Sequence, residues 1–153
     1  MPSRREQIQM TPDEVQAFLD ESRTMNVATY NRDGTIHLVA MWFGMLDGDP
    51  VFWTYGRSQK IRNLERDPRI TALVEEGDAY EQLRGVELVG RGEVITERDA
   101  VMEAGAKVYE RYFGPVTDET RPILETVGAK RHAVRIHVDK LVSWDHRKLG
   151  GVY

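Results

Sequence analysis

Helical spacing of apolar residues marks the first structured segment of the chain. Val15, Phe18 and Leu19 would share one face of a helix. The preceding run TPDE, residues 11–14, supplies a threonine N-cap, a proline at the first helical position and a glutamate that completes a capping box. The pattern therefore predicts a helix over residues 12–22.

After this helix the spacing of the apolar residues changes to that of a β-strand. Three runs are rich in β-branched and aromatic residues, and an Asp-Gly pair separates each run from the next. An Asp-Gly pair between two apolar runs is typical of a tight hairpin, so antiparallel pairing is expected twice. The three predicted strands are Met25–Asn31, Ile36–Met45 and Pro50–Gly56.

A short helix and two further strands are predicted next. Ser58 is a candidate N-cap, Ile61 and Leu64 lie on one helical face, and a proline four positions later marks the stop. The segments Arg69–Glu76 and Val86–Thr96 then have strand character.

Two glycines interrupt the apolar row of the strand Val86–Thr96. Gly90 and Gly92 occupy the same face as its inward valines and leucine. Because a strand glycine has no side chain to pack, this pattern indicates a sharp bend or the close approach of another group.

The remaining chain predicts a long helix, an ambiguous connection and a last strand. Thr96 is a candidate cap for a helix whose apolar residues keep helical spacing until Gly-Pro at 114–115. Residues 116–130 predict a short helix within a long connection. The last strand, Ala133–Trp144, alternates inward valine and isoleucine with outward arginine and histidine.

Six predicted strands with short hairpins and few helices favour one fold class. It is a mostly β fold with peripheral helices, arranged as a six-stranded antiparallel β-barrel. No repeat, low-complexity tract or linker divides the sequence, so we treat residues 1–153 as one domain.

The composition then excludes several functional classes. The 153 residues include no cysteine, which removes disulfides, thiolate catalysis and cysteine-ligated metals. The formal net charge of −4 argues against a nucleic-acid partner, and no apolar run approaches the length of a membrane span or a signal peptide. We therefore expect a soluble, cytoplasmic protein that binds neither nucleic acid nor a membrane.

The common enzyme motifs are absent as well. The sequence contains no phosphate loop, nucleophile elbow, zinc-protease motif or dinucleotide fingerprint. His132 and His137 lie five apart on one predicted strand and so face opposite sides, which is poor geometry for a metal. The sequence predicts no metal site, and it leaves the catalytic residues unassigned.

One segment does suggest chemistry. Arg57 and Lys60 flank the predicted N-cap Ser58, and Asn63 lies one helical turn after the lysine. A helix start offers free backbone N–H groups and a partial positive charge, which suits a phosphate. The segment therefore predicts an anion site, with an ordinary solvated basic turn as the alternative.

The run PVFWTYGRSQKIRNLERDPRITALV, residues 50–74, resembles the flavin-binding split barrels of the pyridoxamine-phosphate-oxidase-like superfamily. Within it KIRNLERDPR, residues 60–69, is most similar to the branch that uses the deazaflavin coenzyme F420. The resemblance implies a split barrel and an F420-dependent oxidoreductase that transfers a hydride between the deazaflavin and an electron-poor small-molecule acceptor. An FMN enzyme on the same fold and a non-catalytic F420-binding or carrier protein are the alternatives.

The resemblance also implies where the cofactor binds. The residues concerned are Val39, Ala40, Met41, Trp42, Trp53, Thr54, Arg57, Ser58, Lys60, Asn63 and Trp144. The first six would contact the ring or its ribityl-like chain, and the next four would hold the phosphate. Trp144 would reach the cofactor across a homodimer interface. Gln59 stands where the FMN oxidases usually carry arginine, which weakens the FMN alternative.

F420 has a glutamate-rich tail beyond its phosphate, so a protein that binds it needs additional cations. Arg57, Lys60 and Arg62 are candidates at the predicted turn. Four more cations lie far along the chain, where only the fold or a partner subunit could bring them close: Lys130, Arg131, Arg147 and Lys148. Tyr55 and His146 are the two side chains considered as proton donors, and a solvent proton serves equally well.

Overall fold

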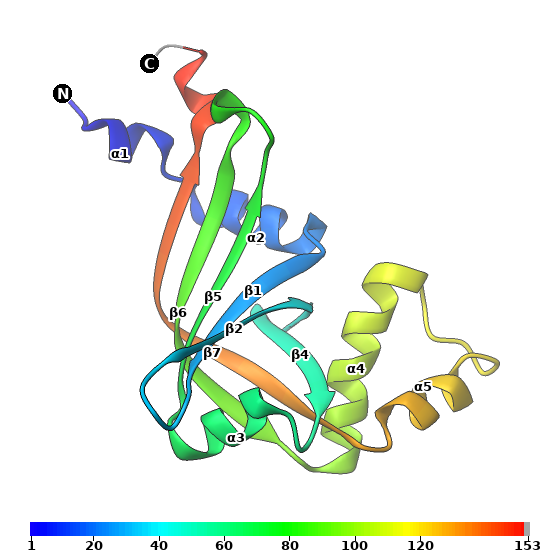
Figure 1. The fold of residues 1–153 in the computed structure, drawn as a ribbon. Coiled ribbons are helices and arrows are strands. Elements are labelled where there is room, and N and C mark those ends of the chain that lie inside the picture. Colours follow the sequence, from blue (N-terminus) through cyan, green and yellow to red (C-terminus); the bar gives the residue numbers. More distant parts are fainter. Residues whose placement is uncertain (152–153) are drawn as a thin grey trace.

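The computed structural model describes residues 1–151 and consists of one curled antiparallel sheet with helices around it (Figure 1). Within these residues seven strands pair in the order β2-β1-β5-β6-β7-β4-β3. The strands are β1 (Thr24–Tyr30), β2 (Ile36–Trp42), β3 (Gly44–Leu46), β4 (Asp49–Tyr55), β5 (Arg69–Glu76), β6 (Arg84–Ile95) and β7 (Arg131–Asp145). The mostly β, antiparallel, barrel-like class predicted from the sequence is confirmed.

The prediction of six strands is wrong by one, because the run Ile36–Met45 forms two strands. β2 pairs with β1, whereas β3 pairs with β4 at the other edge of the sheet. Phe43 lies between them and has no exposed surface, so it anchors the corner where the chain crosses from one edge to the other. Gly44 follows, and a Cβ there would lie 2.7 Å from the backbone of Lys107.

Both predicted hairpin turns are present. The first joins β1 to β2 around Gly34, whose φ is +86°. The second joins β3 to β4 through Asp47 and Gly48, with φ of +50° and +85°. Two consecutive residues with positive φ form the tight turn that matches the twist of paired strands, so Asp-Gly is the expected sequence there.

Helices pack at the ends and on one side of the sheet. The capping box predicted at Thr11 and Glu14 is present, with the two reciprocal hydrogen bonds measuring 3.2 and 2.7 Å. The long helix is capped by the carboxylate of Glu97 instead of the predicted Thr96. The helices are α1 (Arg4–Ile8), α2 (Pro12–Glu21), α3 (Gln59–Arg66), α4 (Arg98–Phe113) and α5 (Arg121–Gly128), with short 3₁₀ turns at Tyr80–Gln82 and His146–Leu149.

The interior of the curled sheet forms the main core. Its apolar side chains come from five strands, while α2 and α3 contribute from the periphery. Phe18, Phe43, Phe52 and Ile61 are among its fully buried members. α3 is thus attached to the barrel through its apolar face.

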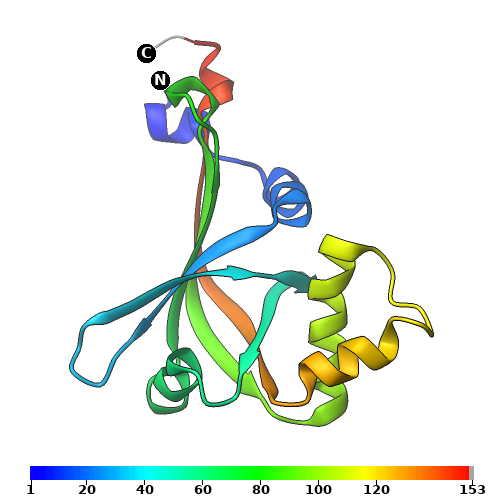
Figure 2. The same cartoon turned by 45° about the vertical axis from the view of Figure 1, so that its right-hand side comes forward.

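A second, smaller core lies outside the barrel, where α4 and α5 cover β4 and β7 (Figures 1 and 2). Trp53 of β4 fills this layer. A Cβ at Gly105 of α4 would lie 2.3 Å from the Trp53 ring, and one at Gly128 of α5 would lie 2.7 Å from it. Both helices can therefore approach the indole closely because they present glycine to it.

The predicted close approach at the β6 glycines is confirmed. The pairing of β6 with β7 shifts register between Val89 and Gly90, and a Cβ at Gly90 would lie 2.0 Å from the carbonyl oxygen of His137. At Gly92 the nearest atoms belong to the end of the Leu64 side chain. The bulge bends both long strands, as glycine-containing irregularities commonly do.

The two ends of the described chain lie together at one end of the molecule, opposite α3 (Figure 2). Met10 donates its backbone N–H to Ser143, and Lys148 contacts both the carbonyl of Gln9 and the carboxylate of Glu14. Within residues 1–151 no helix combines the length and apolarity needed to cross a membrane.

Candidate functional site

The predicted anion segment is a tight turn between β4 and α3. Ser58 donates its backbone N–H to the carbonyl of Tyr55, at 2.9 Å, and Gly56 donates to the carbonyl of Lys130, also at 2.9 Å. The ring of His132 packs against Gly56, where a Cβ would lie 2.8 Å from the ring. The turn is therefore held against the beginning of β7.

A cationic cavity of about 700 Å³ opens beside this turn. It lies between the β4–α3 turn, the start of α4, the end of α5 and the start of β7. No acidic side chain is among the described residues that line it. The lining residues are Tyr55, Gly56, Arg57, Arg98, Ala129, Lys130, Arg131 and His132.

An apolar cavity of about 560 Å³ lies next to the cationic one, between β2, β4, α4 and α5. Trp42 stands at its wall, half exposed, with its ring stacked on Tyr112 at 4.0 Å between centroids and 15° between planes. The lining residues are Met41, Trp42, Trp53, Val108, Tyr109, Phe113, Ile123, Leu124, Val127 and Arg131.

Arg131 lines both cavities and marks their boundary. Its guanidinium carbon lies 5.3 Å from the centroid of the Trp53 ring and 5.0 Å from that of Tyr55. Its Nε donates to the carbonyl of Val127 at 3.2 Å. The cation is thus fixed between two aromatic rings, where it faces apolar surface on one side and further cations on the other.

Lys60 is a partly buried cation of this region, without an ion pair among the described residues. Burial lowers the pKa of its ammonium group, and repulsion from Arg131 lowers it further. No described carboxylate pairs with it. An anion bound here would offset both effects, since it would supply an opposite charge beside the ammonium group.

Two buried polar atoms at the turn also have no hydrogen-bond partner, namely Ser58 Oγ and His132 Nδ1. Buried polar groups are normally paired, so such atoms indicate a missing ligand or water. The Ser58 hydroxyl makes no capping hydrogen bond to the N-terminal N–H groups of α3. The residues at the turn therefore fit the phosphate of a cofactor.

The structure brings together most of the residues that the sequence analysis assigned to a cofactor. Met41, Trp42 and Trp53 line the apolar cavity, and Arg57 lines the cationic one. Lys60 is close enough to Arg131 for their charges to interact. Lys130 and Arg131, remote in the sequence, join them because β7 begins beside the end of β4.

Other assigned residues lie elsewhere. Val39 pairs with Val27 in the sheet, and Ala40 is exposed beside it on the edge strand. Thr54 is buried, only 5% exposed, next to Trp53 on β4. None of these three lines either cavity.

Trp144 lies near the far end of β7, flat against Gly85, where a Cβ would be 2.1 Å from its ring. About 40 Å of strand separates it from Arg131 at the cavities. Within one subunit the two cannot meet, so a cofactor contact by Trp144 requires the partner subunit and stays a prediction.

Arg147 and Lys148, the two C-terminal cations, do not lie at the cavities of their own subunit. Arg147 is paired with Asp145, at 2.7 Å, and Lys148 with Glu14, at 2.6 Å. Arg62 lines a separate hollow with Arg32 and other residues of α3. His146 binds the carbonyl of Tyr80 at this remote end, so of the two proton donors considered only Tyr55 lies at the cavities.

Sequence reasoning missed Arg98 and gave His132 no functional role. Arg98 lies at the first position of α4 and donates to the carbonyl of Gly128 at 2.9 Å, which closes the end of α5. Its place at the cavity depends on how α4 and α5 pack together, and no local pattern signals that.

Comparison with known families identifies the family of the chain. The family described as pyridoxamine 5'-phosphate oxidase matches residues 11–145, and the chain belongs to this family. This confirms the resemblance seen over residues 50–74. A comparison with curated proteins gives no match.

Solved structures support the same fold. A conserved hypothetical protein, Rv2991 from Mycobacterium tuberculosis, shares 43% identity with a TM-score of 0.94, covering 99% of this chain and 95% of the other. An F420 reductase shares 24% identity with a TM-score of 0.65, covering 82% and 94%. An FAD and heme binding protein from Mycobacterium smegmatis shares 17% identity with a TM-score of 0.73, covering 97% and 82%.

Proposed function

We propose that this protein binds coenzyme F420 and is an oxidoreductase that transfers a hydride between the deazaflavin and an electron-poor small molecule. The observation that carries the proposal is that an apolar cavity and a cationic cavity lie next to each other and share Arg131 in their walls. F420 has a flat apolar ring at one end and an extended anionic tail at the other. An apolar cavity next to a cationic one is complementary to a ligand of this kind.

The chain offers distinct residues for each part of such a ligand. The ring fits the apolar cavity beside Trp42 and Trp53, while Lys60, Arg57 and the free N–H groups of α3 suit the phosphate. Lys130, Arg131 and the other cations beyond the turn suit the carboxylates of a tail. When bound, the reduced deazaflavin supplies the hydride from its C5 position.

The protein's part in the reaction is to orient the acceptor and exclude water. Trp42, Tyr109 and Phe113 provide an aromatic wall against which a planar acceptor can stack. Of the two proton donors that the sequence suggests, Tyr55 lines the cationic cavity, so its hydroxyl or a water molecule can supply a proton to the acceptor. This agrees with a cofactor that performs the difficult step while the protein binds and orients.

Cofactor titrations test the proposal directly. We expect F420 to bind more tightly than FMN, and long-tailed F420 more tightly than short-tailed. The affinity should fall as ionic strength rises, because tail carboxylates at the exposed cations are screened by salt. Fluorescence titration at low and high salt measures each effect. Equal affinity for both tail lengths without a salt effect would remove the tail argument, and tighter FMN binding would reverse the cofactor assignment.

A carrier protein that binds F420 without catalysis is distinguished by turnover. The proposal expects the protein to accelerate oxidation of reduced F420 by an activated alkene or quinone. Tight F420 binding with no acceleration for any acceptor of these classes would favour the carrier.

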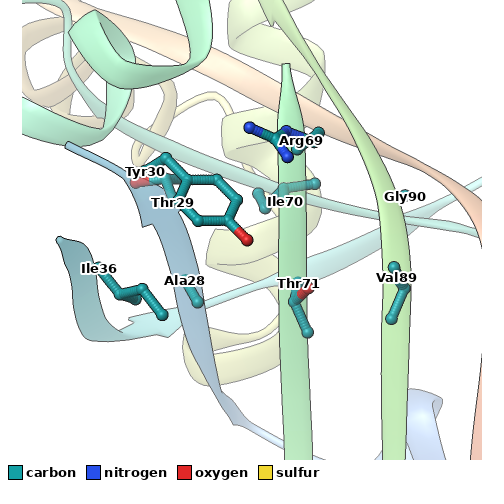
Figure 3. Close-up of a pocket in the computed structure, with 9 residues that line it drawn as sticks. All are labelled: Ala28, Thr29, Tyr30, Ile36, Arg69, Ile70, Thr71, Val89 and Gly90. Atoms are coloured by element: carbon teal, nitrogen blue, oxygen red, sulfur yellow. The ribbon is translucent and has the colours of Figure 1, made fainter. Parts of the chain in front are cut away.

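We further propose that the protein is a homodimer with the cofactor site at the interface. The outward face of β2 exposes Ile36 and Leu38, which are 61% and 67% accessible. Beside them a shallow hollow of about 340 Å³ extends across β1, β5 and β6, between Tyr30, Arg69 and Val89 (Figure 3). Exposed apolar surface of this kind is typical of an interface, and a partner would also bring in Trp144.

A charge on this face tests the dimer. Leu38→Glu should convert the protein to a monomer in light scattering, because the dimer would bury the carboxylate without a partner. Folding of the subunit should be little affected, since residue 38 is exposed. Wild-type protein that is monomeric at micromolar concentration with cofactor bound would contradict the proposal.

A further inference from the structure

The helix that carries the anion-binding turn has little to fix its rotation. α3 has eight residues, and its only two apolar side chains, Ile61 and Leu64, are both buried in the core. A helix this short is not stable by itself and depends on tertiary contacts. The direction in which Lys60 points is set by the rotation of α3, so whatever fixes that rotation also places the ammonium group.

Asn63 supplies the missing constraint. Its side chain has no exposed surface. Its Nδ2 donates to Thr29 Oγ1 at 3.1 Å and to Asn31 Oδ1 at 3.0 Å, both at the end of β1. Its Oδ1 accepts from Gln59 Nε2 at 2.8 Å and from Arg66 Nη2 at 3.2 Å. The two donor hydrogens and both lone pairs of the amide are thus used within the protein.

These bonds connect the middle and the last turn of α3 to the end of β1. Gln59, immediately before Lys60, is tied to Asn63 within the helix. Arg66, in the last turn, also donates to the carbonyl of Tyr30 at 2.6 Å. At the centre of these bonds the Asn63 amide is fully buried and fully satisfied, and such a group selects one arrangement, because breaking one of its bonds leaves a buried polar atom unpaired.

We propose that Asn63 is a positioning residue, which does not itself bind the phosphate but fixes α3 on β1 and thereby places Lys60 and the α3 N-terminus for it. The inference rests on the proposed function, since it concerns the phosphate of that cofactor. It reassigns Asn63 from the set of direct ligands that the sequence resemblance implies, because no hydrogen-bonding atom of its side chain is left for a ligand.

The test compares ligands with and without phosphate in the full-length protein. The probes are F420 with its tail-less, phosphate-free chromophore, and FMN with riboflavin. In Asn63→Leu, the affinity for the phosphate-bearing probe should fall about tenfold while that for the bare chromophore is unchanged. Thr29→Val removes a single bond of the network and should produce a smaller loss in the same direction, which keeps the inference testable if Asn63→Leu folds poorly.

A double-mutant cycle with Lys60 separates positioning from general destabilisation. Because Asn63 acts partly through Lys60 and partly through the α3 N-terminus, Asn63→Leu should cost clearly less than about tenfold in a Lys60→Ala background. Ser22→Ala is the control, because it removes a different buried, hydrogen-bonded polar group outside α3 and β1. It should lower the melting temperature without changing the preference for phosphate.

The outcomes distinguish this inference from the proposed function. If Asn63→Leu weakens both members of a probe pair equally, or has a full effect in the Lys60→Ala background, Asn63 is not a positioning residue. If the wild-type protein prefers neither F420 nor FMN over its phosphate-free form, the proposed function fails, and the inference fails with it.

Discussion

Gly90→Ala is expected to cost about 3 kcal/mol or more of folding stability, enough to leave a protein of this size only marginally folded. The added Cβ would lie 2.0 Å from the carbonyl oxygen of His137 and 3.1 Å from the Cα of Val138. Both atoms are backbone of the paired strand β7, so only a shift of the strand can relieve the collision. Urea denaturation measures the loss.

Gly92→Ala is the matched control on the same face of β6. Its Cβ would meet the terminal methyl groups of Leu64 at 2.9 and 3.0 Å, and a flexible side chain can move aside. We expect a cost of about 1 kcal/mol. Equal losses in the two variants would show that the close approach of β7 does not set the requirement for glycine at position 90.

Lys60→Ala is expected to weaken cofactor binding tenfold to a hundredfold, or about 1.5–3 kcal/mol, because it would remove the proposed charge-assisted contact to the phosphate. Arg62→Ala is the control, since Arg62 belongs to the same helix but lines a different hollow. It should change the affinity little. Comparable losses in both variants would indicate a diffuse electrostatic effect instead of a specific contact.

Lys60 should also make the stability of the cofactor-free protein depend on pH. The sequence suggests a solvated lysine whose loss hardly matters, but the structure half-buries it beside Arg131 and lowers its pKa. The unfolded chain therefore holds the proton more tightly than the native state, and the free energy of unfolding should rise as pH increases from neutral toward the usual lysine range.

Lys60→Met, which keeps most of the apolar stem, should abolish that rise and unfold at a slightly higher temperature than wild type near pH 7. Thermal unfolding across pH 7 to 10 measures both effects. A lower melting temperature for Lys60→Met at pH 7 would show that the charged lysine stabilises the empty protein instead of being held there for a ligand.

Local features of the fold were predictable because their causes lie within a few residues. The Asp-Gly turn at 47–48 and the capping box at Thr11 depend on backbone conformation and neighbouring side chains, and both are present. The split of Ile36–Met45 was not predictable in the same way. Its residues all favour strands, and the break at Phe43 exists because the chain must cross to the other edge of the sheet.

The candidate site likewise has one part that the sequence predicts and one part that depends on tertiary structure. By itself the sequence determined the β4–α3 turn and the residue types there that suit an anion, since Arg57, Ser58 and Lys60 are neighbours in the chain. The tertiary structure alone decided which distant cations join them. Arg98 and Arg131 reach the turn through the packing of α4, α5 and β7, whereas Arg147 and Lys148 are drawn into ion pairs at the opposite end.

Asn63 shows most clearly what tertiary structure adds. In the sequence it lies one turn from Lys60, and helical spacing assigns it to the same anion site. In the fold its amide nitrogen donates to Thr29 and Asn31, more than thirty residues earlier in the chain, and its oxygen accepts from Gln59 and Arg66 of its own helix. Helical periodicity fixes which residues share a face, but the partner that covers that face is chosen only when the sheet has assembled.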